Sequence, residues 1–163
     1  MLPQSVQDAL NDQIRDEFYA SYLYLAVSAY FESINLGGFA RWMLVQSEEE
    51  REHAMRIYDF IHERGGEVVL QAIDQPPTTF DSPLAAFEAA FAHEQRVTQS
   101  IHNIYALAGS ENDYATQVML EWFITEQVEE EKITGDVVHQ LKMVADHPAG
   151  LFMMDRQLGA RSE

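Results

Sequence analysis

Four stretches of this sequence carry metal-ligand residue types where the periodicity predicts the buried face of a helix. Apolar residues recur in each stretch at steps of three and four, which is typical of helices packed nearly parallel to their neighbours. Burying a carboxylate without a positive partner is costly, and these stripes hold almost no basic residues, so a bound metal cation is the expected partner. The residues of metal-ligand type in the middle of the stripes are Glu17, Glu50, His53, Glu94, Gln127 and Glu130.

Glu50 and His53 are three positions apart, so their side chains leave the same face of one helix. A group of carboxylates with a single imidazole suits Fe(II), Mn(II) or Zn(II). Four carboxylates balance the charge of two divalent ions, so we expect a site for two metals that Glu50 bridges. Glu17 and His53 then complete one metal position, and Glu94 and Glu130 complete the other.

Five residues in or beside the stripes have two interpretations each. Gln127 lies beside the second position, as a hydrogen-bond donor or a weak ligand. Glu49, Glu126 and Glu129 flank the stripe positions and could either hold a third cation or face solvent. Tyr24, seven residues after a predicted ligand, is either a redox-active phenol or a core tyrosine. The remaining histidines lack an acidic partner in a stripe, and we assign them no chemistry.

The composition limits the classes of partner. The 163 residues include 27 Asp and Glu against 10 Lys and Arg, giving a net charge of −17, which disfavours nucleic acid and anionic membranes and favours metal cations. No apolar run is long enough to span a membrane, and the first residues do not resemble a signal peptide. The absence of cysteine excludes thiolate metal sites and fits a reducing compartment, so we expect a cytoplasmic protein.

Helix-start and helix-end signals predict the elements that position these residues. We expect an all-α chain of one domain, 1–163, with a bundle over about 5–146 and a short fifth helix over about 148–158. Gly37-Gly38, Gly65-Gly66 and Gly109 end the first three helices, while Ser82 with Pro83 and Asp113 begin the third and fourth. Ser5 and Asp8 predict a capping box on the first helix.

The connections predict the topology. Short turns join helices one and two, and helices three and four, so each pair forms an antiparallel hairpin. The segment 66–82 is about 17 residues long and could reach roughly 55 Å, more than the roughly 40 Å of a bundle helix. We therefore expect a four-helix bundle with one long crossover between helices two and three. In this topology the candidate ligands of all four helices fall at a similar depth.

These residues, in this order, resemble the ferritins, and the chain is similar to the non-haem ferritins of bacteria and archaea over essentially its whole length. The residues that carry the resemblance are Glu17, the Glu50-x-x-His53 pair, Glu94 and the segment 126–130, with Tyr24 and Trp122 also matching. The resemblance implies one iron position at Glu17, Glu50 and His53, a second at Glu50, Glu94 and Glu130 with Gln127 nearby, and a third at Glu49, Glu126 and Glu129.

The resemblance also implies an activity and an assembly. Ferritins are ferroxidases and iron-storage proteins: Fe(II) is oxidised by dioxygen or hydrogen peroxide, and Fe(III) is stored as a mineral inside a homo-oligomeric 24-subunit shell. The haem-binding branch of the family carries a second Glu-x-x-His pair and a Met after the bridging Glu. This chain has Gln127-x-x-Glu130 and Arg51 at those places, so we expect no haem.

Three other functions remain compatible with parts of the pattern. A diiron oxidase or peroxidase of the rubrerythrin type would be expected to carry the second Glu-x-x-His pair, and often a cysteine-rich domain. A passive storage shell would lack ligands of the oxidation site, whereas all of them are present here. A Ca²⁺- or Zn²⁺-binding bundle without redox activity differs from a ferroxidase in its metal and not in its ligand types.

Overall fold

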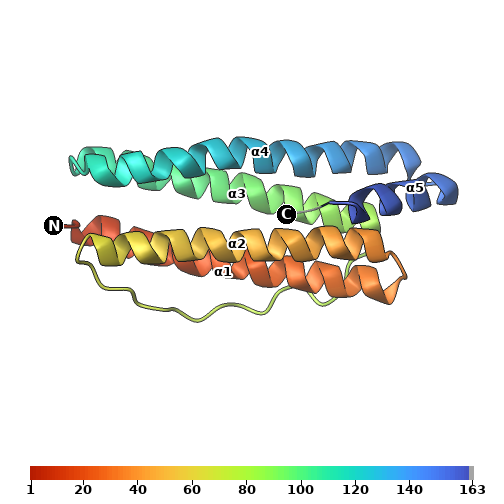
Figure 1. The fold of residues 1–163 in the computed structure, drawn as a ribbon, viewed down its shortest axis with the longest axis horizontal. Coiled ribbons are helices and arrows are strands. Elements are labelled where there is room, and N and C mark those ends of the chain that lie inside the picture. The colour runs from red at the N-terminus through yellow and green to blue at the C-terminus, as the bar shows by residue number, and fades with distance from the viewer. Residues whose placement is uncertain (162–163) are drawn as a thin grey trace.

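The computed structural model describes residues 1–161, which form five helices and no strand (Figure 1). Their bounds are α1 Gln4–Ser33, α2 Gly37–Glu63, α3 Pro83–Ser110, α4 Tyr114–Val144 and α5 Pro148–Gly159. None of these helices combines the length and the hydropathy needed to cross a bilayer.

The arrangement is the predicted four-helix bundle. Helices α1 and α2 form one antiparallel pair and α3 and α4 the other, while α1 also packs against α3. The segment between α2 and α3 runs the length of the bundle along the α1–α2 pair, and α5 lies at the end of the bundle where α2 begins and α4 ends (Figure 1). The prediction of an all-α bundle with one long crossover and a short fifth helix is therefore confirmed.

The helix ends agree with the sequence signals in two cases and differ in one. The Ser82 hydroxyl accepts a hydrogen bond from the Ala85 amide over 3.0 Å, and an Asp113 oxygen accepts one from the Thr116 amide over 3.3 Å, so both predicted N-caps are present. The capping box at Ser5 is wrong, because Pro3, two residues earlier, is the N-cap residue of α1, and the Ser5 hydroxyl donates to Glu111 instead. A long-range contact has taken the place of a local one.

Two apolar clusters fill the bundle, one toward each end. The first includes Phe31, Met43, Ala90 and Val137, and the second includes Ile14, Ile57, Val97 and Phe123. On each bundle helix, the candidate ligands lie in the sequence between members of one cluster and members of the other. The polar site therefore occupies a layer inside the bundle that has an apolar cluster on both sides.

Helix α5 docks against the start of α2 through an unusually close backbone contact. A Cβ atom on Gly38 would lie 1.6 Å from the carbonyl oxygen of Asp155, and one on Gly159 would lie 2.9 Å from the Gly38 Cα atom. The Asp155 carboxylate also accepts a hydrogen bond from the Phe39 amide over 3.0 Å, at the N-terminus of α2 where amide groups lack helical partners. Glycine at Gly38 thus permits the docking of the fifth helix.

Candidate metal centre

The bundle buries every residue that the sequence predicts as a ligand of the two metal positions. Glu17, Glu50, Glu94 and Glu130 are at most 2% exposed, and His53 is 4% exposed. They come from all four bundle helices, α1, α2, α3 and α4. A cluster of four buried carboxylates with one imidazole has no stable arrangement in a dry interior unless protons or cations neutralise it.

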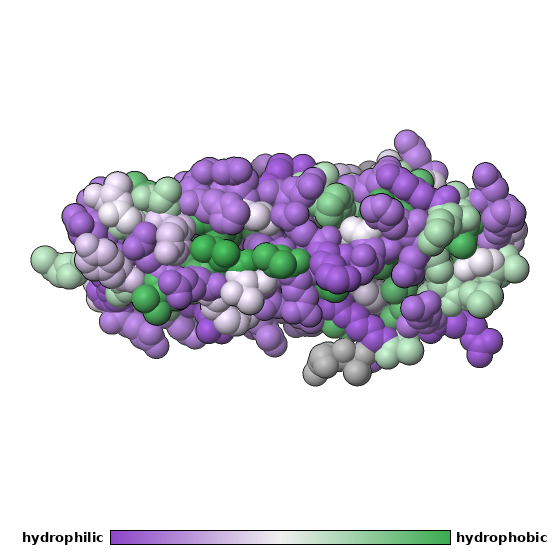
Figure 2. Space-filling view, turned by 90° about the horizontal axis from the view of Figure 1, so that it is seen from above, coloured by the Kyte–Doolittle hydropathy of each residue, from purple (hydrophilic) through white to green (hydrophobic). Residues whose placement is uncertain are grey.

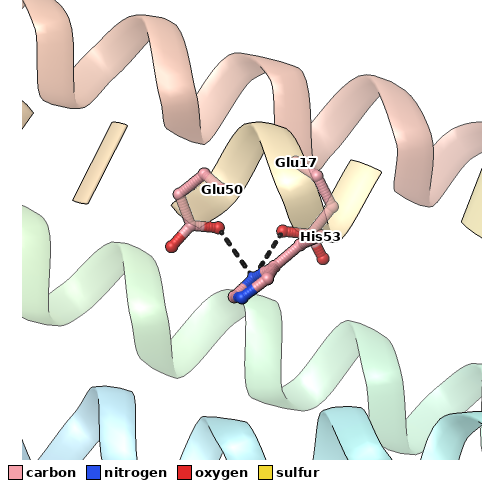
Figure 3. Close-up of side chains that lie close together, drawn as sticks. All are labelled: Glu17, Glu50 and His53. Carbon is pink, nitrogen blue, oxygen red and sulfur yellow. Dashed lines mark ion pairs between the residues drawn. The ribbon is translucent and has the colours of Figure 1, made fainter. Parts of the chain in front are cut away.

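Glu17, Glu50 and His53 form the first compact group, with ligand atoms within 4.8 Å of one another. The two carboxylates approach one edge of the imidazole (Figure 3): Nδ1 of His53 lies 3.4 Å from Oε2 of Glu50 and 3.9 Å from Oε2 of Glu17. These three atoms are buried and have no hydrogen-bond partner. Two ligands about 2.1 Å from one metal ion lie roughly 3 Å apart, so this spacing fits a shared ion after small side-chain movements.

Glu50, Glu94 and Glu130 form the second compact group, also with ligand atoms within 4.8 Å of one another. Glu50 belongs to both groups, as expected of a residue that bridges two metals. The second group contains oxygen atoms only, whereas the first contains a nitrogen. The two groups therefore differ in ligand chemistry although they share a residue.

Neutral groups donate hydrogen bonds to the carboxylates of the centre. The Gln13 amide donates to Glu17 over 2.8 Å, and the Gln127 amide donates to Glu94 over 3.2 Å. The Gln46 amide donates to Glu50 over 3.3 Å and to Glu130 over 2.5 Å, and the Tyr24 hydroxyl donates to Glu94. These donors orient the carboxylate oxygens without cancelling their charge. Gln127 thus acts as a hydrogen-bond donor to Glu94.

The burial of these acids changes their protonation. Desolvation, followed by the charge of Glu50, raises the pKa of Glu17 well above its usual value, and desolvation likewise raises the pKa of Glu50 and of Glu94. Desolvation and the neighbouring Glu94 raise the pKa of Glu130 to about 8. Metal-free protein therefore holds protons in the centre near neutral pH, and a divalent cation would displace them.

The acids predicted for a third cation position are more dispersed. Glu126 is half-buried and lies near His53 and Glu130, with ligand atoms of the three within 4.8 Å of one another. Glu49 is half-buried, Glu129 is exposed, and neither belongs to a compact group of metal-ligand atoms among the described residues. The third position stays a prediction.

The structure adds residues to which the sequence analysis assigned no role. Gln46 lies in the interior stripe, four residues before Glu50, and this spacing could have identified it as a donor to that ligand. Gln13 lies four residues before Glu17 in the same relation. His93 is 5% exposed with both ring nitrogens unpartnered, and its ring packs against those of Tyr19 and Tyr24. No local sequence signal distinguishes this histidine from an exposed one.

An all-helical bundle with one long crossover and a buried layer of glutamates and histidine defines a ferritin-like protein. Residues 7–144 match the family described as "Ferritin-like domain". The bacterial non-heme ferritin of Staphylococcus saprophyticus is 40% identical over 99% of this chain and 97% of its own length. That of Bacteroides fragilis is 42% identical over 99% of this chain and 100% of its own length.

Solved structures agree with these relatives. An open-pore ferritin from the hyperthermophilic archaeon Archaeoglobus fulgidus superposes with a TM-score of 0.98 at 44% identity, covering 99% of this chain and 100% of that chain. A humanized archaeal ferritin superposes with a TM-score of 0.99 at 43% identity over the full length of both chains. The chain therefore belongs to the ferritin family of iron-storage proteins.

Proposed function

We propose that this chain is a ferroxidase subunit of an iron-storage shell, in which the buried centre oxidises two Fe(II) ions per chain. One observation carries the proposal: Glu50 belongs to two compact ligand groups that together draw on all four bundle helices. Two Fe(II) ions bound to one shared carboxylate would lie close together, and each of them can donate one electron. Iron is the substrate that the ferritin family takes up, and carboxylates with one imidazole suit Fe(II).

In this proposal each ligand group has a separate role. Glu17 and His53 hold the first Fe(II) with one oxygen of Glu50, while Glu94 and Glu130 hold the second with the other oxygen of Glu50. Binding releases the protons that the desolvated acids hold in metal-free protein. Oxygen ligands favour the harder Fe(III) ion over Fe(II), so the carboxylates favour oxidation.

The electron count agrees with a two-metal centre. Two Fe(II) ions supply two electrons, which together with two protons reduce one dioxygen to hydrogen peroxide, or one hydrogen peroxide to two waters. The Fe(III) produced then hydrolyses, releases protons and is deposited as a mineral. The net charge of −17 per chain supports the attraction of iron cations toward the assembly.

Storage also requires a shell, and we propose a homo-oligomer of 24 chains. Apolar side chains on α5 support a further interface, because Phe152 is 61% exposed and Met153 is 73% exposed in the single chain. The space-filling view shows apolar residues at the end of the molecule where α5 lies, beside a largely hydrophilic surface (Figure 2). The native mass should be about 450 kDa, against 18.6 kDa for one chain.

The ferroxidase proposal is tested by adding Fe(II) to aerobic, metal-free protein and following the Fe(III) absorbance. We expect a rapid phase that ends at two Fe(II) per chain, followed by slower growth as mineral forms. Glu50→Ala should abolish the rapid phase with the fold retained, because both positions lose a ligand. Glu52→Ala, which removes an exposed carboxylate from the same helix, is the matched control and should retain it.

Two outcomes would contradict the proposal. An unchanged rapid phase in Glu50→Ala would exclude Glu50 from the oxidation site. Tight binding of Zn²⁺ or Ca²⁺ without any rapid Fe(II) oxidation would favour a metal-binding bundle that has no redox activity.

A further inference from the structure

Arg161, two residues after the end of α5, lies across one face of α2. Its guanidinium carbon is 4.6 Å from the centre of the Trp42 ring, Nη1 donates to Oε1 of Gln46 over 2.9 Å, and Nη2 donates to Oε2 of Glu49 over 2.6 Å. Trp42, Gln46 and Glu49 are spaced by four and three residues, so they share a helix face. Three contacts of different kinds therefore hold one arginine side chain in place.

The docking of α5 explains why the arginine reaches this face. The close contact between Gly38 and Gly159, together with the bond from the Phe39 amide to Asp155, fixes the end of α5 beside the start of α2. The side chain of Arg161 is only 19% exposed as a result. It extends from a position 115 residues away in the sequence to a residue that contacts the metal centre.

Gln46 is the residue through which this contact can reach the ligands. Its side chain is fully buried, and its amide nitrogen donates to Oε1 of Glu50 and to Oε2 of Glu130. An amide group has a donor end and an acceptor end, and a guanidinium can only donate. Arg161 therefore requires the oxygen of Gln46 to face it, which directs the NH₂ group toward the two carboxylates. If the Gln46 amide turned over, its NH₂ group would face the guanidinium of Arg161, and its oxygen would face the carboxylates of Glu50 and Glu130.

The first metal position has a comparable but independent arrangement. The Gln13 amide donates to Glu17 and its oxygen accepts a hydrogen bond from the Ser100 hydroxyl over 2.6 Å. Ser100 belongs to α3, so this arrangement lies within the bundle and does not involve the C-terminal segment. The two positions can therefore respond differently when the C-terminal segment changes.

We propose that Arg161 is a positioning residue of the second metal position: it fixes the Gln46 amide so that Glu50 and Glu130 present their oxygens to that metal. The inference rests on the proposed function, since it assigns these carboxylates to a metal. It makes occupancy of the second position depend on the docked C-terminal segment. Removing a partner that orients a metal ligand typically costs roughly tenfold to a hundredfold in metal affinity.

The test is an anaerobic titration of metal-free, assembled protein with Co(II), followed by visible absorbance and calorimetry. Wild-type protein should bind two Co(II) per chain in the bundle. Arg161→Met should weaken the second binding event roughly tenfold to a hundredfold, because Gln46 contacts two ligands of that position. The first event, at the imidazole position, should weaken less, because Gln46 contacts only the shared Glu50 there. Arg161→Lys should recover part of the loss, because an ammonium group can still donate to Gln46. Arg156→Met, at an exposed arginine of α5, is the matched control.

A double-mutant cycle separates positioning through Gln46 from a general loss of stability. If Arg161 acts through Gln46, the double variant of Arg161→Met and Gln46→Met should bind the second Co(II) no more weakly than Gln46→Met alone. Additive losses, equal weakening of both positions, or no weakening in Arg161→Met would overturn the inference while leaving the proposed centre intact. Wild-type protein that binds no Co(II) in the bundle would overturn the proposed function and this inference together.

Discussion

The Tyr24 hydroxyl on α1 donates a hydrogen bond to Oε1 of Glu94 on α3, and neither side chain has any exposed surface. Desolvation, with the charge of Glu94 as the next cause, raises the pKa of Tyr24 well above its usual value. The phenol is therefore neutral and acts as a donor to a candidate iron ligand. If the phenol loses an electron during oxidation, Oε1 of Glu94 is placed to accept its proton.

Tyr24→Phe tests this relationship. The change keeps the ring that fills the core and removes the donor to a buried carboxyl group, so we expect stability to fall by about 1–3 kcal/mol. We expect two Co(II) still to bind per chain and the rapid phase of Fe(II) oxidation to slow. Stopped-flow absorbance and denaturant unfolding measure the two effects. Tyr19→Phe is the control, because Tyr19 lies on α1 like Tyr24 and also contacts His93. Equal slowing of Fe(II) oxidation in both variants would exclude a special role for Tyr24.

His53→Ala and Glu94→Ala should each remove one metal position and spare the other. His53 belongs to the group with the imidazole, and Glu94 belongs to the group with oxygen ligands only. We expect each variant to bind one Co(II) per chain, and we expect the nitrogen ligand to be detectable spectroscopically only in Glu94→Ala. Uptake of two ions by either variant would contradict the assignment of ligands. Neither variant should show the rapid two-iron phase, because each lacks one of the two electron donors.

The stability of metal-free protein should fall as the pH rises. The unfolded chain releases the Glu130 proton near its usual pKa of 4.5, whereas the folded chain holds it up to a pKa of about 8. The folded state thus binds more protons between these values, and the free energy of unfolding decreases across this range. Glu17, Glu50 and Glu94 act in the same direction because their pKa values are also raised.

Denaturant unfolding of chelator-treated protein between about pH 5 and pH 8, at constant ionic strength, measures how the free energy of unfolding changes with pH. We expect a negative slope. Glu130→Gln should reduce it, because the glutamine carries no proton to release. Saturation with Co(II) should reverse it, since metal binding strengthens as the acids lose their protons. A metal-free protein that becomes more stable over this range would contradict the predicted proton uptake.

Gly38→Ala should disturb the docking of α5, whereas Gly37→Ala should not. A Cβ atom on Gly38 would collide with the Asp155 carbonyl, while one on Gly37 would meet no atom within 4 Å. We expect Gly38→Ala to lower the free energy of unfolding by about 1–3 kcal/mol or more. Gly37→Ala should be neutral or slightly stabilising, because alanine is a better helix former than glycine. Thermal unfolding measures both, and equal stability of the two variants would contradict the observed contact.

Predicting the bundle and its ligand layer from the sequence was possible because both depend on local periodicity. The spacing of three and four residues places Glu17, Glu50 and Glu94 on the same helix faces as their apolar neighbours, and burial then follows from packing those faces together. Ser82 and Asp113 cap their helices through contacts only a few residues long. These features have causes that lie within one or two helical turns, and no contact from another helix displaces them, so the sequence alone determined them.

The tertiary structure alone decided which polar groups meet across helices. Arg161 reaches Gln46, Ser100 reaches Gln13, and Ser5 leaves its expected cap for Glu111. Each contact depends on the axial offset and rotation of packed elements, which vary around preferred packing classes and which no local pattern specifies. Periodicity therefore determined that acids enter the interior, while the docking of whole helices decided which groups from other elements meet them and their same-helix donors.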